Sequence, residues 1–144
     1  AGPGYDEKYQ LHLRALVKNY KLKDRIFFSD ALYRDIKWGS LLACECMLLS
    51  SHGENFGISL VEALSLGKPV ITTNKVNISK DILSYNAGLV STDTVSGFSK
   101  NLLKFHKFDK RKKLIMSQHA SRCFKNNFDI SLVNNTLTSF LEKL

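Results

Sequence analysis

Apolar residues recur along the chain at two spacings, one typical of helices and one of short strands. Residues 9–20 place apolar side chains on one stripe with lysines opposite, which is typical of an amphipathic helix. The alternation of such segments with short apolar runs predicts an α/β fold, in which helices cover both faces of a parallel sheet. The expected strands are residues 25–29, 46–50, 70–73 and 88–90, and the other expected helices are residues 35–43, 79–85, 93–106, 109–126 and 130–144.

Two of these segments carry sharper expectations. In residues 35–43, the helical spacing places Ile36, Leu41 and Leu42 on the inner face. Residues 25–29 are short and apolar, so we expect a strand there with an unpaired edge if its neighbours in the sheet lie outside this chain.

Residues 54–73 predict a loop, a helix and a buried strand in direct succession. Gly57 permits close backbone approach at the helix start, and Gly67 stands where a helix ends in a left-handed turn. The β-branched run 70–73 is typical of a central parallel strand. The N–H groups at the start of a helix bind anions, and a carboxylate one or two turns further can accept hydrogen bonds from a diol. Phosphate beside a pair of sugar hydroxyls is what a nucleotide-sugar presents.

The order of these residues resembles a known family. Glu54, the pair Phe56-Gly57 and Glu62 are similar to the spaced glutamate motif of the retaining glycosyltransferases of the GT-B fold, particularly family 4. The resemblance covers most of the chain: residues 1–4, 24–28, 47–51 and 86–90 look like successive strands of that family's Rossmann-like donor domain. It implies a donor-binding domain over residues 1–144, truncated at its N-terminal side.

The resemblance also implies roles for individual residues. Glu54 would be the catalytic position, in contact with the transferred sugar, and Glu62 would hold the ribose hydroxyls. Backbone amides after Glu54 would meet sugar hydroxyls and the diphosphate, and residues 29–32 would border the base. The expected donor-binding residues are Asn55, Phe56, Gly57, Ile58, Ser59, Glu62, Ser29 and Leu32. For Asn55 a second interpretation stays open, in which its side-chain oxygen caps the helix at the Ile58 N–H.

The sequence departs from the family's pattern in two places. Ser50 stands where proline is usual, and residues 76–81 replace a Gly-Gly turn and its glutamate, with Asp81 one methylene shorter. The family's phosphate-binding arginine and lysine, and its N-terminal acceptor domain, would lie upstream of residue 1. The function implied is transfer of a sugar from a UDP- or GDP-linked donor to a glycan or a lipid-linked acceptor, with negligible activity for this chain alone. A non-catalytic GT-B-like binding module and a sugar-nucleotide epimerase of the same architecture remain alternatives.

The composition and charge limit the classes of partner that we expect. The net charge is +8, and basic residues cluster at residues 18–25 and 104–113. No nucleic-acid module pattern is present, so we expect no nucleic acid, whereas peripheral contact with an anionic membrane agrees with the charge. No metal-ligand spacing or cofactor motif is found, and the family is metal-independent, so neither is expected. The start of the sequence has no signal-peptide pattern, and the odd number of cysteines, three, is interpreted as reduced thiols. Both favour a cytoplasmic protein, for which the charge adds peripheral contact with the inner face of the membrane.

Overall fold

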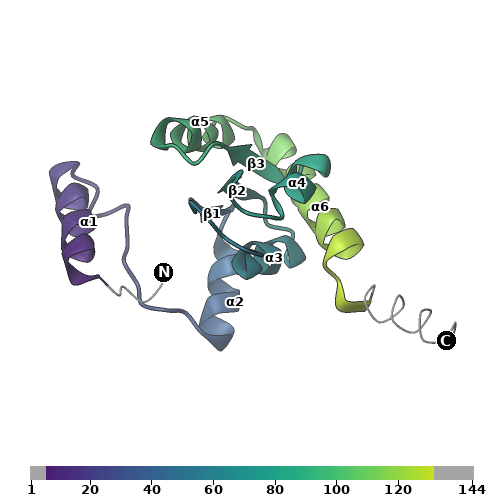
Figure 1. Ribbon diagram of the computed structural model, residues 1–144, viewed down its shortest axis with the longest axis horizontal. Helices are drawn as coiled ribbons and strands as arrows, with labels where there is room; N and C mark the ends of the chain where they lie inside the picture. Colours follow the sequence, from purple (N-terminus) through teal and green to yellow (C-terminus); the bar gives the residue numbers. More distant parts are fainter. Residues whose placement is uncertain (1–5, 132–144) are drawn as a thin grey trace, which may run out of the picture. The chain divides into compact units, whose positions relative to one another are not determined.

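The computed structural model describes residues 6–131, whose helices and strands are shown in Figure 1. The chain divides into two compact units, an N-terminal unit of residues 1–40 and a C-terminal unit of residues 41–144. The predicted strand end at residues 1–4 and most of the predicted helix 130–144 lie outside the described residues. No helix within the described range is both long and apolar enough to cross a bilayer.

The N-terminal unit contains helix α1 (Glu7–Asn19), which confirms the helix predicted over residues 9–20. Asp6 caps it, because its side chain accepts a hydrogen bond from the Tyr9 N–H at 3.0 Å. Glu7 in the first turn and Lys18 in the last turn suit the helix dipole. None of the residues of α1 is buried.

The strand predicted over residues 25–29 is wrong, because these residues adopt no regular structure. Ile26, Phe27 and Phe28 are exposed, and Phe27 retains 82% of its accessible surface. A strand requires a neighbour for its backbone N–H and C=O groups, and no segment within residues 6–131 pairs with this run. The Phe28 ring instead lies under the Arg14 guanidinium, 4.7 Å from the ring centre.

Helix α2 (Arg34–Ala43) confirms the helix predicted over residues 35–43, but only part of its predicted inner face is covered. Leu41 packs against the core, whereas Ile36 and Leu42 are exposed. Helical spacing shows which side chains share a stripe, but it does not show whether another element covers that stripe.

Three parallel strands form the sheet, in the order β1-β2-β3. They are β1 (Met47–Leu49), β2 (Val70–Thr73) and β3 (Gly88–Ser91), which confirms three of the predicted strands. Val70 pairs with both Met47 and Gly88, so β2 is the central strand. All four residues of β2 are buried, which explains its β-branched composition.

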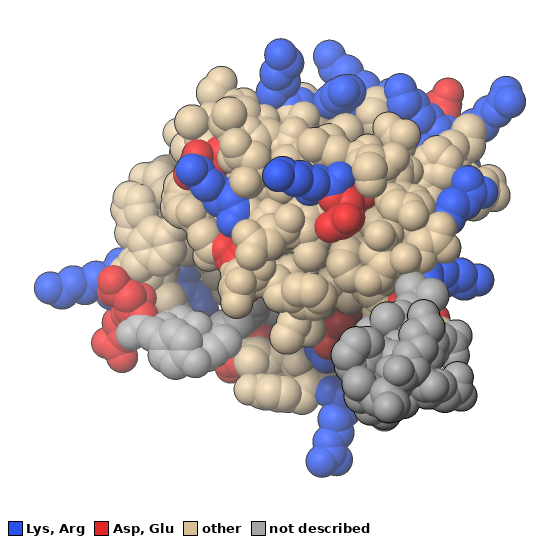
Figure 2. All heavy atoms as spheres, turned by 45° about the vertical axis from the view of Figure 1, so that its right-hand side comes forward, with Lys and Arg blue, Asp and Glu red and all other residues tan. Residues whose placement is uncertain are grey.

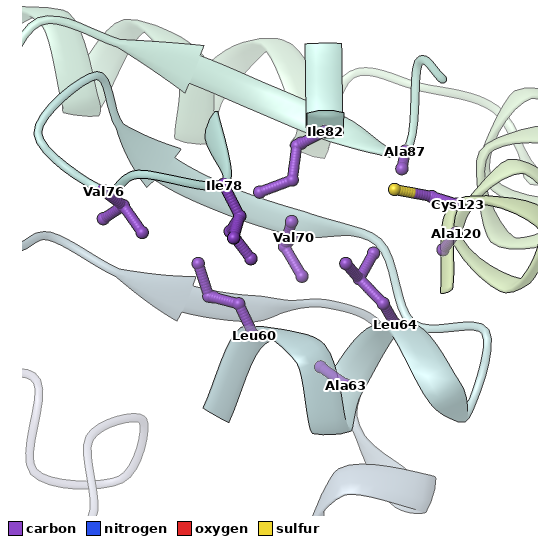
Figure 3. Close-up of a cluster of buried hydrophobic side chains, with 10 residues drawn as sticks. All are labelled: Leu60, Ala63, Leu64, Val70, Val76, Ile78, Ile82, Ala87, Ala120 and Cys123. Atoms are coloured by element: carbon purple, nitrogen blue, oxygen red, sulfur yellow. The ribbon is translucent and has the colours of Figure 1, made fainter. Parts of the chain in front are cut away.

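Helices cover both faces of this sheet. They are α3 (Ile58–Ser65), α4 (Ser79–Ser84), α5 (Val95–His106) and α6 (Lys110–Asn127), as the sequence predicts to within about two residues. Val70 and Ile71 are neighbours in β2 and point to opposite faces. On the Val70 face, shown in Figure 3, side chains of α3, α4 and the second half of α6 form one apolar cluster. On the Ile71 face, Phe105 of α5 and Met116 of α6 form a second cluster.

A glycine turn connects α3 to β2. Gly67 has a φ of +67°, in the left-handed region where side chains with a Cβ are strained. The Gly67 N–H donates to the Leu64 carbonyl and the Lys68 N–H to the Ala63 carbonyl, both at 2.9 Å. These two bonds end the helix as predicted and return the chain to the sheet within a few residues.

Candidate functional site

The candidate site lies at the carboxyl edge of the sheet, where the segments after β1, β2 and β3 meet. Two buried threonines at the end of β2 fix this edge to the neighbouring strand. The Thr72 hydroxyl donates to the Leu49 carbonyl at 3.0 Å, and the Thr73 hydroxyl donates to the Ser51 carbonyl. On the other side, the Asn74 N–H donates to the Ser91 carbonyl at 2.8 Å. Ligands bind at such edges in open α/β sheets.

Glu54 is held by its backbone as well as by its side chain. Its N–H donates to the Lys75 carbonyl at 3.2 Å, and its carbonyl accepts from the Asn77 N–H at 3.3 Å. These bonds make an isolated parallel bridge between Glu54 and Val76, which joins the loop after β1 to the loop after β2. The half-buried side chain turns toward α3, where its Oε1 accepts from the Gly57 N–H at 3.3 Å.

Gly57 is the N-cap residue of α3. Its φ of 77° and ψ of 50° are left-handed, and a Cβ at this position would lie 3.1 Å from Cγ1 of buried Val76. The Gly57 carbonyl accepts from the Leu60 and Val61 N–H groups. Within residues 6–131 the N–H groups of Ile58 and Ser59 make no hydrogen bond, so the first turn of α3 presents donors to a ligand.

Asn55 and Phe56 connect this loop to other elements. The Asn55 Oδ1 accepts from the Asn77 Nδ2 at 3.2 Å, and the cap of α3 is Gly57, without a side-chain hydrogen bond. The interpretation of Asn55 as the cap is therefore wrong, because its oxygen is engaged by the loop after β2. The half-exposed Phe56 ring meets the edge of Phe128 at 6.0 Å and 88°, which ties the loop to the end of α6.

Glu62 lies on α3, four residues after Ile58, and is half-buried. Residues four apart share one side of a helix, and four residues of helix rise about 6 Å. The core contacts of α3 come from Leu60, Ala63 and Leu64, so Glu62 lies beside this packed face. The fold therefore places one carboxylate before the first turn of α3 and a second carboxylate one turn into the helix.

The remaining predicted residues belong to the other unit. Ser29 is exposed and Leu32 half-buried, and neither is in a helix or strand of the N-terminal unit. Their contact with a nucleotide base stays a prediction. Among the described side chains, no group of three or more His, Cys, Asp or Glu is placed to hold a metal ion.

Three residues at this edge were missed by the sequence reasoning: Lys75, Asn77 and Asp93. Nδ1 of exposed His52 lies 3.3 Å from Oδ2 of Asp93, which follows β3. This hydrogen bond, with a smaller contribution from the charge of Lys75, lowers the pKa of the Asp93 carboxyl. The sequence could have indicated these three residues through their position directly after β2 and β3, because parallel strands bring their carboxyl ends to one edge of the sheet.

Comparison with known proteins identifies relatives of the chain. Residues 1–120 match the profile of the family described as Glycosyl transferases group 1. The chain is 31% identical over 91 residues to alpha-1,3/1,6-mannosyltransferase ALG2 of Dictyostelium discoideum, a match that covers 61% of this chain. It is 38% identical over 74 residues, or 51% of this chain, to the O-antigen biosynthesis glycosyltransferase WclY of Escherichia coli.

Solved structures share the fold at lower identity. Anabaena HepE, in complex with UDP and glucose, matches with a TM-score of 0.82 and 22% identity over 99% of this chain and 39% of HepE. The C-terminal domain of LpcC from Francisella tularensis, a glycosyl transferase group 1 family protein, matches with a TM-score of 0.73 and 20% identity over 87% of this chain and 65% of that domain. The alignments with the two curated relatives span only 22% and 20% of their lengths.

Proposed function

The chain belongs to the family of glycosyl transferases group 1, and from this membership we propose that it is the donor-binding part of a retaining family 4 transferase with the GT-B fold. In this proposal it forms most of the C-terminal domain, and the natural protein moves a hexosyl group from a nucleotide-sugar to a glycan or a lipid-linked acceptor. The observation that carries the proposal is the arrangement of Glu54, Gly57 and Glu62 around the first turn of α3.

The chemistry of transfer sets what this turn must do. When the bond between the sugar and the diphosphate breaks, negative charge builds on the leaving phosphate. The N–H groups of Ile58 and Ser59 and the dipole of α3 stabilise such charge. The loop that precedes them is held before the donor binds, since the Gly57 N–H donates to the Glu54 carboxylate and Glu54 forms a bridge with Val76. Lys75 adds a cation to the same edge, close enough to affect Asp93.

In this proposal Glu62 binds the ribose of the donor. One carboxylate has lone pairs for both hydroxyls of a cis diol, and Glu62 is about one helical turn from the N–H groups proposed to hold the diphosphate. Glu54 has a different role, because its carboxylate already occupies the Gly57 N–H in the absence of donor. An incoming donor would exchange this contact, so that Glu54 turns to the sugar hydroxyls.

A nuclear magnetic resonance titration of the 144-residue chain tests the donor site. Addition of UDP, GDP or UDP-glucose is expected to shift the amide signals of Gly57, Ile58 and Ser59, and to leave that of Gly88, at the opposite edge of the sheet, in place. Glu62→Ala should weaken nucleotide binding roughly 10- to 100-fold, since it removes hydrogen bonds to a charged acceptor. The matched control Glu7→Ala removes an exposed glutamate at the start of α1 and should leave affinity unchanged.

The variant Glu54→Gln distinguishes the proposed role of Glu54 from that of Glu62. It removes a negative charge beside the diphosphate, so affinity for UDP should hold or rise, while the additional affinity given by the glucose moiety should fall. Unchanged binding in Glu62→Ala, or shifts spread evenly over both edges of the sheet, would contradict the proposed site. Release of UDP from UDP-glucose at a rate typical of a complete transferase would refute the proposal that this chain alone is inactive.

A further inference from the structure

Of the two basic clusters, the one in residues 95–127 carries the larger net positive charge. This segment contains nine lysines and arginines and one acidic residue, Asp109, so its net charge of +8 equals that of the whole chain. It comprises α5, the connecting turn and α6. Figure 2 shows Lys and Arg side chains projecting along the upper margin of the molecule, the side on which Figure 1 places α5. Charge that served solubility alone would have no reason to gather here.

Helix stability does not explain the charge either. Lys110, Arg111, Lys112 and Lys113 form the first turn of α6, and that turn contains no acidic residue. Positive charge is unfavourable at the N-terminus of a helix because of the helix dipole. Of the four, Lys113 and Lys112 are engaged within the protein: the Lys113 Nζ lies 2.7 Å from Oε2 of Glu45, and the Lys112 ammonium lies over the Phe108 ring. Lys110 and Arg111 add positive charge at a position that is unfavourable for folding, which indicates that the charge serves another purpose.

The exposed side of α5 combines charge with aliphatic surface. Lys100 is three and four residues before Leu103 and Lys104, and these two are four and three residues before Lys107, so the four residues form one stripe, which we call the lysine stripe. All four residues are exposed, and Leu103 retains 60% of its accessible surface. The other side of the helix is fixed to the core through Phe105.

A hollow of about 300 Å³ adjoins the lysine stripe, at the amino end of β3. This places it at the edge of the sheet opposite to Glu54. Its lining includes Lys104 of the stripe and, from α6, Lys112, Ile115 and His119, and none of its lining residues is acidic. The walls thus offer cations near an apolar floor, which suits a phosphate group attached to an apolar body.

The aromatic residues in this region argue against stacking with nucleic acid bases. Phe105 is 5% exposed, and the Phe108 ring is covered by the Lys112 ammonium, 4.1 Å from its centre. Base stacking needs open ring faces. The exposed apolar groups are aliphatic instead: Leu103, Leu114 and Ile115. Aliphatic side chains between lysines suit the boundary between lipid headgroups and acyl chains.

From these observations we propose that the α5–α6 surface docks on an anionic phospholipid bilayer, with the lysine stripe along the headgroups and a headgroup phosphate in the hollow. Leu103 and Ile115 then enter the upper acyl region. The docking surface and the donor site lie at opposite edges of one sheet, so the membrane leaves the donor site open. This inference does not depend on the proposed donor site and can fail separately from it.

Vesicle sedimentation with the 144-residue chain tests the proposal. The vesicles are pure phosphatidylcholine or equal parts of phosphatidylcholine and phosphatidylglycerol, and binding is expected only to the anionic vesicles. The triple variant K100E/K104E/K107E should lose at least about 100-fold in affinity, since each lysine at an anionic surface contributes roughly fivefold. The variant K100Q/K104Q/K107Q introduces no acidic charge and should show most of the same loss, which keeps the result readable if the first variant is less stable.

The matched control is K8E/K18E/K80E, which changes the net charge equally through exposed lysines of α1 and α4. Its affinity should change only a few-fold. L103S/I115S keeps the charge and should weaken binding by about tenfold through lost apolar contact. Equal losses in the two charge-reversal variants would overturn the proposal, because total charge would then explain binding. So would tighter binding to a single-stranded oligonucleotide than to vesicles, or saturation by soluble glycerol phosphate without vesicle binding.

Discussion

The left-handed cap at Gly57 makes a quantitative prediction about both stability and donor binding. Gly57→Ala adds one methyl group at a φ of 77°, and an L-residue in this region costs about 1–2 kcal/mol. The new Cβ would lie 3.1 Å from Cγ1 of Val76, tighter than ordinary contact, and Val76 is buried and has little room to move. We therefore expect the free energy of unfolding to fall by about 2 kcal/mol in total.

Thermal unfolding followed by circular dichroism measures this cost. For a chain of this length, a loss of about 2 kcal/mol lowers Tm by roughly 6 °C. The control is Gly53→Ala in the same loop, where no atom lies within 4 Å of the added Cβ. Its stability should change by less than about 0.5 kcal/mol, as for surface substitutions in general.

The same variant tests whether the cap prepares the donor site. If the methyl group moves the Gly57 N–H away from the Glu54 carboxylate, the first turn of α3 loses its fixed geometry, and the nucleotide-induced shifts of Ile58 and Ser59 should weaken. The titration is run well below Tm, where both variants are folded. Wild-type Tm together with wild-type nucleotide shifts in Gly57→Ala would refute the reasoning, since neither the conformation nor the contact with Val76 would then matter.

Two further predictions follow from charge and burial. Lys110→Glu at the first turn of α6 should raise the free energy of unfolding by about 0.3–1 kcal/mol, and Lys125→Glu at the last turn should lower it by a similar amount, because the two positions lie at opposite ends of the helix dipole. Chemical denaturation of the two variants measures both changes. Changes of the same sign in the two variants would contradict the prediction. Burial is the main cause that raises the pKa of the Cys46 and Cys123 thiols to about 11. At pH 8 only about 0.1% of each is thiolate, so alkylation by iodoacetamide should be on the order of 100-fold slower than for free cysteine. Mass spectrometry measures the rates, denaturant should abolish the difference, and fast native alkylation would contradict it.

The sequence predicted most of the C-terminal unit because its elements carry local signals. Gly67 ends α3, the β-branched run of β2 needs burial on both faces, and Thr94 and Asp109 cap α5 and α6. Each of these signals acts within a few residues, so it can be recognised without knowledge of the fold. The same holds for Gly57, whose position at the start of α3 follows from the residues on either side of it.

The predictions that were wrong concern residues whose structure depends on partners distant in the sequence. Residues 25–29 have the composition of a strand, but composition does not supply the neighbouring strand that pairing requires. Ile36 and Leu42 have the correct helical spacing, but nothing in the spacing shows whether another element covers them. Asn55 has the side chain of a helix cap, yet its oxygen meets Asn77, 22 residues later. In each case the structure of the residue depends on which distant segments the fold brings next to it.

The structure shows what holds the short loop of the proposed donor site in place. A loop of glycine and polar residues has little apolar surface to hold it, so its order must come from hydrogen bonds. The backbone of Glu54 bridges to Val76, its side chain binds the Gly57 N–H, and Phe56 packs against Phe128. These contacts fix the four consecutive residues 54–57 to one another, to the loop after β2 and to the end of α6. A site with its donors fixed in advance loses less conformational entropy on binding and stabilises developing charge without rearrangement. Val76 and Asn77 lie in the stretch that departs from the family's pattern, and they are the residues that hold this loop from the side of β2.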